Sequence, residues 1–334
     1  MRKKVLLSGM QPSGETGMLH LGNYEGALKN WVRLQNSGEY EMYCCIVDWH
    51  SLTSDYKHTK SLNKRILNVA ADYIASGLDP EKSTIFLQSL VKEHAELHLL
   101  LSMIVPIPWL ERVPSYKQKS AELGLDSFGF LGYRLLMAAD IMVYKGEVVP
   151  VGKDQAAHLE FTREVVRRFN SLYGELFPEP QPLWTKVPVL LGTDGRKMSK
   201  SYNNHISLGD PQDVVKKKIS SMFTDPDKIH RTDPGHPDRC PVYLLHKLYN
   251  PEHEKIYNPC ISGSTDWGCV RCKKLLTEHL LAFLEPIRKK REELLSDPGE
   301  LMRIIASGAD KAREKASATM REVRTAMHML EAEL

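Results

Sequence analysis

Short apolar runs alternate with helical patterns through the first half of the chain, and this alternation narrows the folds that it can adopt. The apolar runs cover residues 4–9, 41–48, 84–89 and 147–151, and an amphipathic pattern that ends at a glycine predicts a helix over residues 59–77. Strands joined by helical crossovers lie parallel in one sheet, with right-handed connections. The sequence therefore predicts an α/β fold with a doubly wound parallel sheet.

Two further segments depart from this alternation. Residues 93–145 are too long for one crossover helix and predict a helical insertion. The pattern becomes mostly helical after residue 210. The helix start signal Ser296-Asp297-Pro298 predicts a last helix that follows it. We expect a catalytic domain of residues 1–210, a second, mostly helical domain of residues 211–298, and a C-terminal helix over residues 299–334 that packs back on the first domain.

The composition is compatible with a nucleic-acid partner without requiring one. The formal net charge of +3 over 334 residues is far from the strongly basic balance of a dedicated nucleic-acid binder. No segment reaches the roughly 18 uninterrupted apolar residues of a membrane helix. The apolar run near the N-terminus is too short for a secretory signal. We therefore expect a cytoplasmic protein with no membrane contact.

Two polar segments carry groups that suit a phosphate site. A Pro/Ser/Gly-rich loop over residues 10–17 follows the first apolar run and leads into Leu19-His20-Leu21-Gly22-Asn23, where a helix N-terminus would attract an anion. Far downstream, Lys197-Met198-Ser199-Lys200-Ser201 would place two ammonium groups on a polyphosphate. Alone, each segment is more often an ordinary loop or a solvated face, but their joint order and spacing favour one phosphate site.

The two segments resemble the signature elements of the class I aminoacyl-tRNA synthetases, in the tryptophanyl/tyrosyl subgroup. Leu19 to Gly22 is similar to the family's "HIGH" element, and Lys197 to Ser201 matches its "KMSKS" loop at all five positions. Four further stretches favour the tryptophanyl branch: Ser8 to Gly14, Val47 to His50, Met137 to Asp140, and Gly152 to His158. The resemblance covers nearly the whole chain.

The resemblance implies a Rossmann-like catalytic domain that activates L-tryptophan with ATP to tryptophanyl-adenylate and transfers it to the 3′ end of tRNA(Trp). A tyrosine-specific relative, a small nucleotidyltransferase that adenylylates a metabolite, and a synthetase-like regulatory protein that senses tryptophan without charging tRNA are the alternatives. The intact His20 and the complete lysine loop, residues 197–201, argue against the regulatory protein.

The resemblance also assigns site residues. The catalytic groups are His20, Lys197 and Lys200, acting with Mg²⁺ on the phosphates. The ATP contacts are Gln11, Pro12, Ser13, Gly22, Asn23, Gly152, Lys153, Asp154, Val189, Lys197, Met198, Ser199, Lys200 and Ser201. Val189 is expected in a strand that precedes the lysine loop. The tryptophan contacts are Asp140, Met137, Tyr133, His50 and Gln155.

The chain departs from the family's usual pattern at three places. The first loop is about three residues longer than usual, at Glu15 to Met18. Tyr133-Arg134 stands where a Tyr-Pro pair is common, and Lys153 stands where an acidic residue often stands. These departures bear on the contacts of the first loop and on the roles of Tyr133 and Lys153.

Asp140 stands in a strongly apolar stretch, where a carboxylate is costly to bury without a donor. The indole N–H of tryptophan is such a donor, and a site built to accept it would reject phenylalanine. An ion pair with Arg134 or Lys145 is the structural alternative, and the resemblance favours substrate contact. Met137, three residues earlier on the same helical face, would then line the indole pocket, although core packing explains Met137 taken alone.

Four of the six cysteines cluster in the second domain: Cys240, Cys260, Cys269 and Cys272. Disulfides are rare in the cytoplasm, so the cluster suggests one tetrahedral metal centre. One Cys-x-x-Cys pair and a Cys-Pro dipeptide favour iron–sulfur over zinc, with no metal as the remaining alternative. A subset of bacterial tryptophanyl enzymes is known for a four-iron cluster on such cysteines, so the resemblance implies a [4Fe-4S] centre. Cys44 and Cys45, adjacent in an expected strand, should be buried on opposite faces.

Two partner surfaces are expected. In the resembled family the helical insertion, residues 93–145, supports a homodimer. Basic clusters at residues 216–218 and 288–291 are solvated helix faces or contacts to tRNA.

Overall fold

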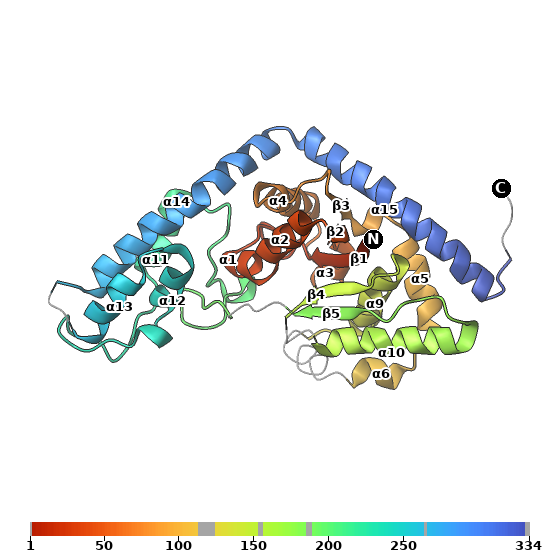
Figure 1. Ribbon diagram of the computed structural model, residues 1–334, viewed down its shortest axis with the longest axis horizontal. Helices are drawn as coiled ribbons and strands as arrows, with labels where there is room; N and C mark the ends of the chain where they lie inside the picture. The colour runs from red at the N-terminus through yellow and green to blue at the C-terminus, as the bar shows by residue number, and fades with distance from the viewer. Residues whose placement is uncertain (1, 113–123, 153–155, 185–188, 264–265, 331–334) are drawn as a thin grey trace.

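The computed structural model describes residues 2–112, 124–152, 156–184, 189–263 and 266–330. Five parallel strands form one sheet in the order β3-β2-β1-β4-β5. Their bounds are β1 Lys4–Met10, β2 Tyr40–Ile46, β3 Ser83–Leu87, β4 Val148–Val151 and β5 Gln181–Trp184. The order reverses at β1, so the predicted doubly wound α/β fold is confirmed (Figure 1).

Alternate strand residues face two separate hydrophobic layers. Leu6 of β1 and Cys44 of β2 belong to the core under α2 (Lys29–Ser37) and α4 (Leu62–Ala75). Leu7 and Cys45 belong to the opposite core, under α5 (Glu93–Ser102), α9 (Tyr133–Val143) and α10 (Ala156–Tyr173). The expectation that Cys44 and Cys45 are buried on opposite faces is therefore confirmed.

The edge strand β5 was not predicted from the sequence. Pro182 lies inside it, and proline is tolerated only at a sheet edge, where its missing N–H costs no ladder bond. The strand expected at Val189 is wrong, because Val189 lies outside every described strand and its side chain is 61% exposed.

The remaining helices complete the first half of the chain and the helical region after it. In the first half they are α1 (Leu21–Asn23), the π-helix η1 (Tyr24–Leu28), α3 (Asp48–Asp55), η2 (Gln88–Leu90), α6 (Ile107–Glu111) and α8 (Phe128–Leu131). After the lysine loop they are η4 (Lys200–Tyr202), α11 (Gln212–Ser220), η5 (Pro237–Arg239), α12 (Pro241–Tyr249) and α13 (Glu254–Ile261). The helical stretch that interrupts the strand alternation contains α6 and α8, together with α5 and α9 named above.

Two long helices, α14 (Cys269–Ser296) and α15 (Pro298–Ala326), run across the whole molecule and meet at an angle (Figure 1). α14 packs on α11 and α12 near its start and on α4 further along, and α15 packs on β3. The approach to β3 is close, because a Cβ on Gly308 would come within 1.9 Å of the Ile85 carbonyl oxygen. None of the described helices is both long and apolar enough to cross a bilayer.

Candidate active site

Backbone hydrogen bonds bring the two signature segments together, although about 180 residues separate them. The Leu21 N–H donates to the Ile206 carbonyl at 2.9 Å, and the Leu208 N–H donates to the Leu19 carbonyl at 2.8 Å. Leu19 follows the loop after β1, and Ile206 follows the lysine loop. The lysine loop is thereby attached to the segment that carries His20.

His20 is the N-cap of α1 and is held in one orientation. Its Nδ1 accepts the Asn23 N–H at 3.2 Å, and the Asn23 Oδ1 accepts the His20 N–H at 3.1 Å. A Cβ on Gly22 would lie 2.9 Å from the imidazole ring, so this position suits glycine. Gly22 therefore makes room for His20 in addition to any room it makes for a nucleotide.

The imidazole of His20 is neutral. Burial, and then the charges of Lys200 and His205, lower the pKa of His20 to about 3. Because Nδ1 accepts a hydrogen bond, the ring proton is assigned to Nε2. The Nε2–H of His20 is thus a hydrogen-bond donor suited to a phosphoryl oxygen, without a positive charge of its own.

The lysine loop is braced by Asn204, a residue that the sequence patterns did not single out. This buried side chain donates from Nδ2 to the Lys197 carbonyl at 3.1 Å and accepts the Ser199 N–H at 2.8 Å. A Cβ on Gly192 would come within 2.3 Å of the Asn204 amide, so the loop needs glycine there. The Asn204 amide thus bonds two backbone groups of the loop and fixes the backbone between the two lysines.

The two lysines of the loop stand in different environments. The Lys200 Nζ donates to the carbonyls of Ser13 at 2.9 Å and Gly17 at 3.2 Å, so the lengthened first loop holds it. Burial lowers the pKa of Lys200 to about 8; nearby Asp72 opposes this change and Arg65 adds to it. Lys197 is exposed to solvent.

The other predicted ATP contacts lie around these groups. Gln11 is exposed, Pro12 is buried and Ser13 is half-buried in the loop after β1, and Gly152 follows β4 directly. Met198 is buried, whereas the Ser199 hydroxyl caps η4 by accepting the Ser201 N–H at 3.2 Å. Lys153 and Asp154 lie outside the described residues.

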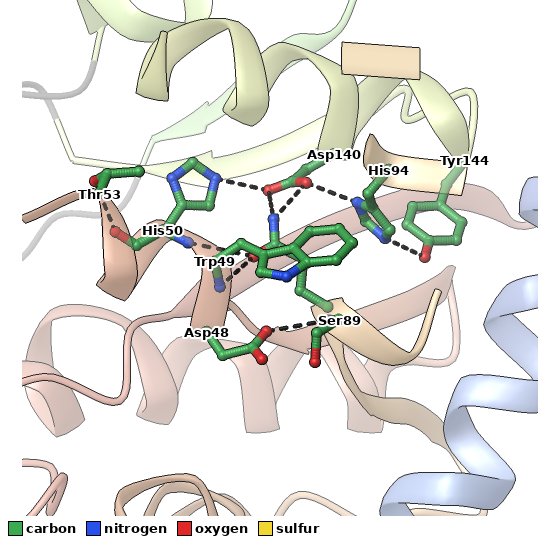
Figure 2. A network of polar contacts seen from close by, with 9 residues as sticks. Asp48, Trp49, His50, Thr53, Ser89, His94, Asp140 and Tyr144 are labelled. Atoms are coloured by element: carbon green, nitrogen blue, oxygen red, sulfur yellow. Dashed lines mark hydrogen bonds and ion pairs between the residues drawn. The ribbon is translucent and has the colours of Figure 1, made fainter. Parts of the chain in front are cut away.

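A second polar cluster surrounds the buried carboxylate of Asp140 (Figure 2). Its Oδ2 lies 2.8 Å from the His50 Nε2, and its Oδ1 lies 2.6 Å from the His94 Nδ1. The Gln88 amide donates to both oxygens, at 2.7 and 3.0 Å. Among the described residues the carboxylate pairs with neither Arg134 nor Lys145, so the structural alternative for Asp140 is wrong as stated.

These neighbours keep Asp140 ionised. Burial would raise the pKa of Asp140, but the charges and hydrogen bonds of His94 and His50 outweigh burial and lower the pKa below its usual value. On the side of the His94 ring away from Asp140, Nε2 lies 2.7 Å from the Tyr144 hydroxyl (Figure 2). This second contact fixes the orientation of the imidazole. The arrangement is a fixed negative charge with hydrogen-bonding partners on both oxygens.

Gln88 and His94 were not predicted from the sequence. Both side chains are fully buried. Gln88 directly follows β3, and residues at the carboxyl ends of parallel strands meet at the ligand edge of the sheet, which is the signal that points to Gln88. His94 lies in α5 with no motif around it, so nothing in the sequence distinguishes it.

Of the remaining predicted tryptophan contacts, the structure describes Tyr133 and Met137. The Tyr133 ring stands edge-on to His50 with the ring centroids 6.3 Å apart, and its hydroxyl lies 3.3 Å from the His158 Nε2. Met137 is half-buried and packs against the core under α9. Gln155 lies outside the described residues. The structure therefore brings His50, Tyr133 and Asp140 together.

The four clustered cysteines come from three elements and line one cavity. Cys240 precedes α12, Cys260 lies in α13, and Cys269 and Cys272 form the first turn of α14. All four thiols are free and half-buried. Burial, together with the neighbouring cysteines, raises the pKa of Cys240, Cys260 and Cys272.

A second set of side chains, two of which also line this cavity, has metal-binding atoms within 4.8 Å of one another: Asp225, Asp227 and His236. Their contacts are already satisfied within the protein. The His236 Nδ1 lies 2.7 Å from the Asp225 Oδ2, and the Arg239 guanidinium pairs with both carboxylates. We interpret the set as a structural ion-pair group.

Comparison with known proteins identifies the family. The family described as tRNA synthetases class I (W and Y) matches residues 1–285. The tryptophan–tRNA ligase of Thermotoga maritima is 47% identical, over 97% of this chain and 99% of its own length. That of Aquifex aeolicus is 43% identical, over 97% of this chain and 99% of its own length.

A comparison with solved structures indicates the same family. The tryptophanyl-tRNA synthetase of Campylobacter jejuni, complexed with ADP and tryptophan, is 37% identical and has a TM-score of 0.87, covering 97% of this chain and 100% of its own. The family match covers residues 1–285, and these relatives extend over nearly the whole chain. The chain belongs to the class I tRNA synthetases for tryptophan and tyrosine.

Proposed function

We propose that this chain performs tryptophan–tRNA ligation with the two clusters described above, the phosphate site around His20 and Lys200 and the carboxylate site around Asp140. The relatives that cover nearly the whole chain share the tryptophan activity. The observation that carries the assignment of roles is the attachment of the lysine loop to the His20 segment. Charging of tRNA(Trp) with labelled tryptophan, with tyrosine as the competing amino acid, tests the activity.

In the proposed reaction the ionised tryptophan carboxylate attacks the α-phosphorus of ATP in line, and pyrophosphate leaves. The reaction needs no general base, because the carboxylate is ionised at neutral pH. Catalysis then consists of positioning and charge stabilisation by the Nε2–H of His20 and the ammonium groups of Lys197 and Lys200. Mg²⁺ bound with ATP would supply further charge neutralisation on the phosphates. A ribose hydroxyl at the tRNA 3′ end then attacks the aminoacyl carbonyl.

The tryptophan site requires one change at Asp140. A carboxylate accepts about four hydrogen bonds, and His50, His94 and the two contacts of Gln88 already fill them. The Gln88 amide is shared between both oxygens, so it can release one of them without losing its partner. We infer that the indole N–H replaces one of these two contacts.

The pH dependence of adenylation provides a test of Lys200. Because burial lowers the pKa of Lys200 to about 8, its ammonium is charged below that pH and loses its proton above it. We expect kcat/KM for ATP, which reports the free enzyme, to fall as pH rises through about 8. A Lys200→Arg variant should be slower but keep a flat profile there, because guanidinium stays charged. The same decline in both enzymes would contradict this role.

The four cysteines support a [4Fe-4S] centre better than zinc. Zinc sites usually show two paired knuckles. These four cysteines come as one Cys-x-x-Cys pair and two single cysteines, one of them in a Cys-Pro dipeptide, which favours iron–sulfur. The residues that would hold the cluster are Cys240, Cys260, Cys269 and Cys272.

A Cys269→Ser variant should lose this centre and impair tRNA charging more than tryptophan-dependent pyrophosphate exchange. The cysteines lie away from the ATP and tryptophan groups, in the helical region of residues 211–298, which we propose binds the tRNA anticodon. Ligand binding at such a centre couples to local folding. Iron, sulfide and zinc analysis of anaerobically purified protein identifies the centre, with exposed Val270→Ser as the control for metal content. Metal-free wild-type protein, together with normal charging by Cys269→Ser, would refute it.

The proposed homodimer rests on exposed apolar side chains in the helical insertion. These side chains are more than half exposed in the single chain: Leu99, Met103, Ile107 and Phe128. Several large apolar side chains exposed on one helical segment suit a protein interface. The insertion is therefore the surface that we assign to the second subunit.

A further inference from the structure

A buried carboxylate lies directly behind the His20 segment. Asp72 of α4 is fully buried, and its Oδ2 accepts the Leu19 N–H at 2.6 Å. Its Oδ1 accepts a hydrogen bond from the Nε of Arg291, a buried residue of α14. A side chain from the long helix α14 is thus connected through one carboxylate to Leu19, the residue that precedes His20.

Arg291 has a second connection to the same loop. Its Nη2 donates to the Asn68 Oδ1 at 2.9 Å, and the Asn68 Nδ2 donates to the Thr16 carbonyl at 2.9 Å. Its guanidinium also fills the space beside Gly209, where a Cβ would lie 2.3 Å from Nη1. Arg291 therefore contacts, directly or through one residue, both the first loop and the segment that follows the lysine loop.

Lys200 shares this environment. Its Nζ is hydrogen-bonded to the Gly17 carbonyl, one residue along the loop from Thr16. The carboxylate of Asp72 opposes the effect of burial on the pKa of Lys200, so the negative charge of Asp72 favours the ammonium form. Asp72 thus acts on both signature elements, through a hydrogen bond on one and through its charge on the other.

α14 also connects this point to the cysteine region. Phe283, two helical turns before Arg291, packs edge-on against Tyr24 of the π-helix that follows Asn23, with the ring centroids 5.2 Å apart. Cys272 is in the first turn of the same helix, about 30 Å from Arg291 at 1.5 Å per residue. One continuous helix, α14 in Figure 1, therefore carries Arg291 and two of the cysteines that line the cavity.

We propose that Asp72 and Arg291 are positioning residues for adenylation, which hold the first loop and the lysine loop in one arrangement and make it depend on the docking of α14. This inference rests on the proposed function. A buried ion pair is weak evidence for stability, since well-packed apolar side chains often stabilise a core as well or better. The contacts to Leu19, Thr16 and Gly209 instead indicate that the pair positions the first loop and the segment after the lysine loop.

The test is pyrophosphate exchange by Arg291→Lys and Asn68→Ala enzymes, with the tryptophan dissociation constant measured by equilibrium dialysis. Arg291→Lys keeps the charge but loses the two-armed contact, and Asn68→Ala keeps the ion pair but releases Thr16. We expect kcat/KM for ATP to fall about tenfold or more in Arg291→Lys, because small misplacement of reacting groups is costly, with a tryptophan dissociation constant within about twofold of wild type. Arg303→Gln, which changes an exposed ion pair on α15, is the control and should match wild type.

The outcomes separate this inference from the function on which it rests. Variants that melt at a lower temperature but keep wild-type ATP kinetics well below that temperature would make the pair purely structural and overturn the proposal. If Arg291→Lys does not fold, Asn68→Ala gives the same readout, and normal ATP kinetics in Asn68→Ala then overturns it. Absence of exchange by the wild-type enzyme would instead contradict the proposed function.

Discussion

Replacement of Lys200 by alanine is expected to lower the rate of adenylation on the order of 10²-fold or more, by analogy with the removal of one oxyanion donor. Tryptophan binding should change far less, because the lysine meets phosphate charge that develops in the transition state. The contacts of Lys200 with the carbonyls of Ser13 and Gly17 place its ammonium beside the first loop, close to the His20 segment. Lys197→Ala should behave similarly, since Lys197 comes from the same braced loop.

Tryptophan-dependent pyrophosphate exchange measures this effect, with the tryptophan dissociation constant measured in parallel. Lys82→Ala is the matched control, because Lys82 is an exposed lysine whose partner is Asp79. Exchange rates near wild type in both Lys197→Ala and Lys200→Ala would make the lysine loop an ordinary surface loop.

Substitution of Asp140 by asparagine or alanine should reduce kcat/KM for tryptophan by about 1 to 3 kcal/mol, the cost of losing a hydrogen bond to a buried charged acceptor. Discrimination against phenylalanine should fall as well, because the site would no longer penalise the missing indole N–H. The loss also disturbs His50 and His94, whose rings are oriented by this carboxylate.

Discrimination between tryptophan and phenylalanine distinguishes a structural effect of the Asp140 substitutions from the loss of a substrate contact. A purely structural effect lowers the melting temperature and leaves the ratio of kcat/KM for tryptophan and phenylalanine unchanged, whereas loss of a substrate contact lowers the ratio. Asp79→Asn, a change at a more exposed carboxylate, is the control. Unchanged tryptophan kinetics in a folded Asp140→Ala enzyme would assign Asp140 to structure.

Local patterns predicted most of the sheet. The apolar runs at residues 4–9 and 41–48 correspond to β1 and β2 within two residues, because buried parallel strands are continuous apolar runs. β5 was missed because Pro182 weakens its strand signal, and only its position at the edge makes the strand acceptable.

The predicted residues that the structure brings together stand in motifs, whereas residues that meet them only in three dimensions were not predicted. His20 and the lysine loop have recognisable neighbours in sequence. Gln88 and His94 reach Asp140 across 52 and 46 positions of the chain, so no local pattern reveals them.

The basic cluster at residues 288–291 shows the same limit. The interpretation of this cluster as a solvated face is wrong for two of its four residues. Arg288 and Arg291, three residues apart, lie on the inner face of α14 and are buried. Lys289 and Lys290 are exposed.

The assignment of roles depends above all on the His20 segment and the lysine loop forming one adenylation site for tryptophan. Exchange of labelled pyrophosphate into ATP by the purified chain provides the sharpest test, with tryptophan, tyrosine or no amino acid added, and with charging of tRNA(Trp) followed alongside. We expect exchange that requires tryptophan, is not supported by tyrosine and is accompanied by charging. Exchange driven by tyrosine, or tryptophan binding with neither exchange nor charging, would contradict the assignment.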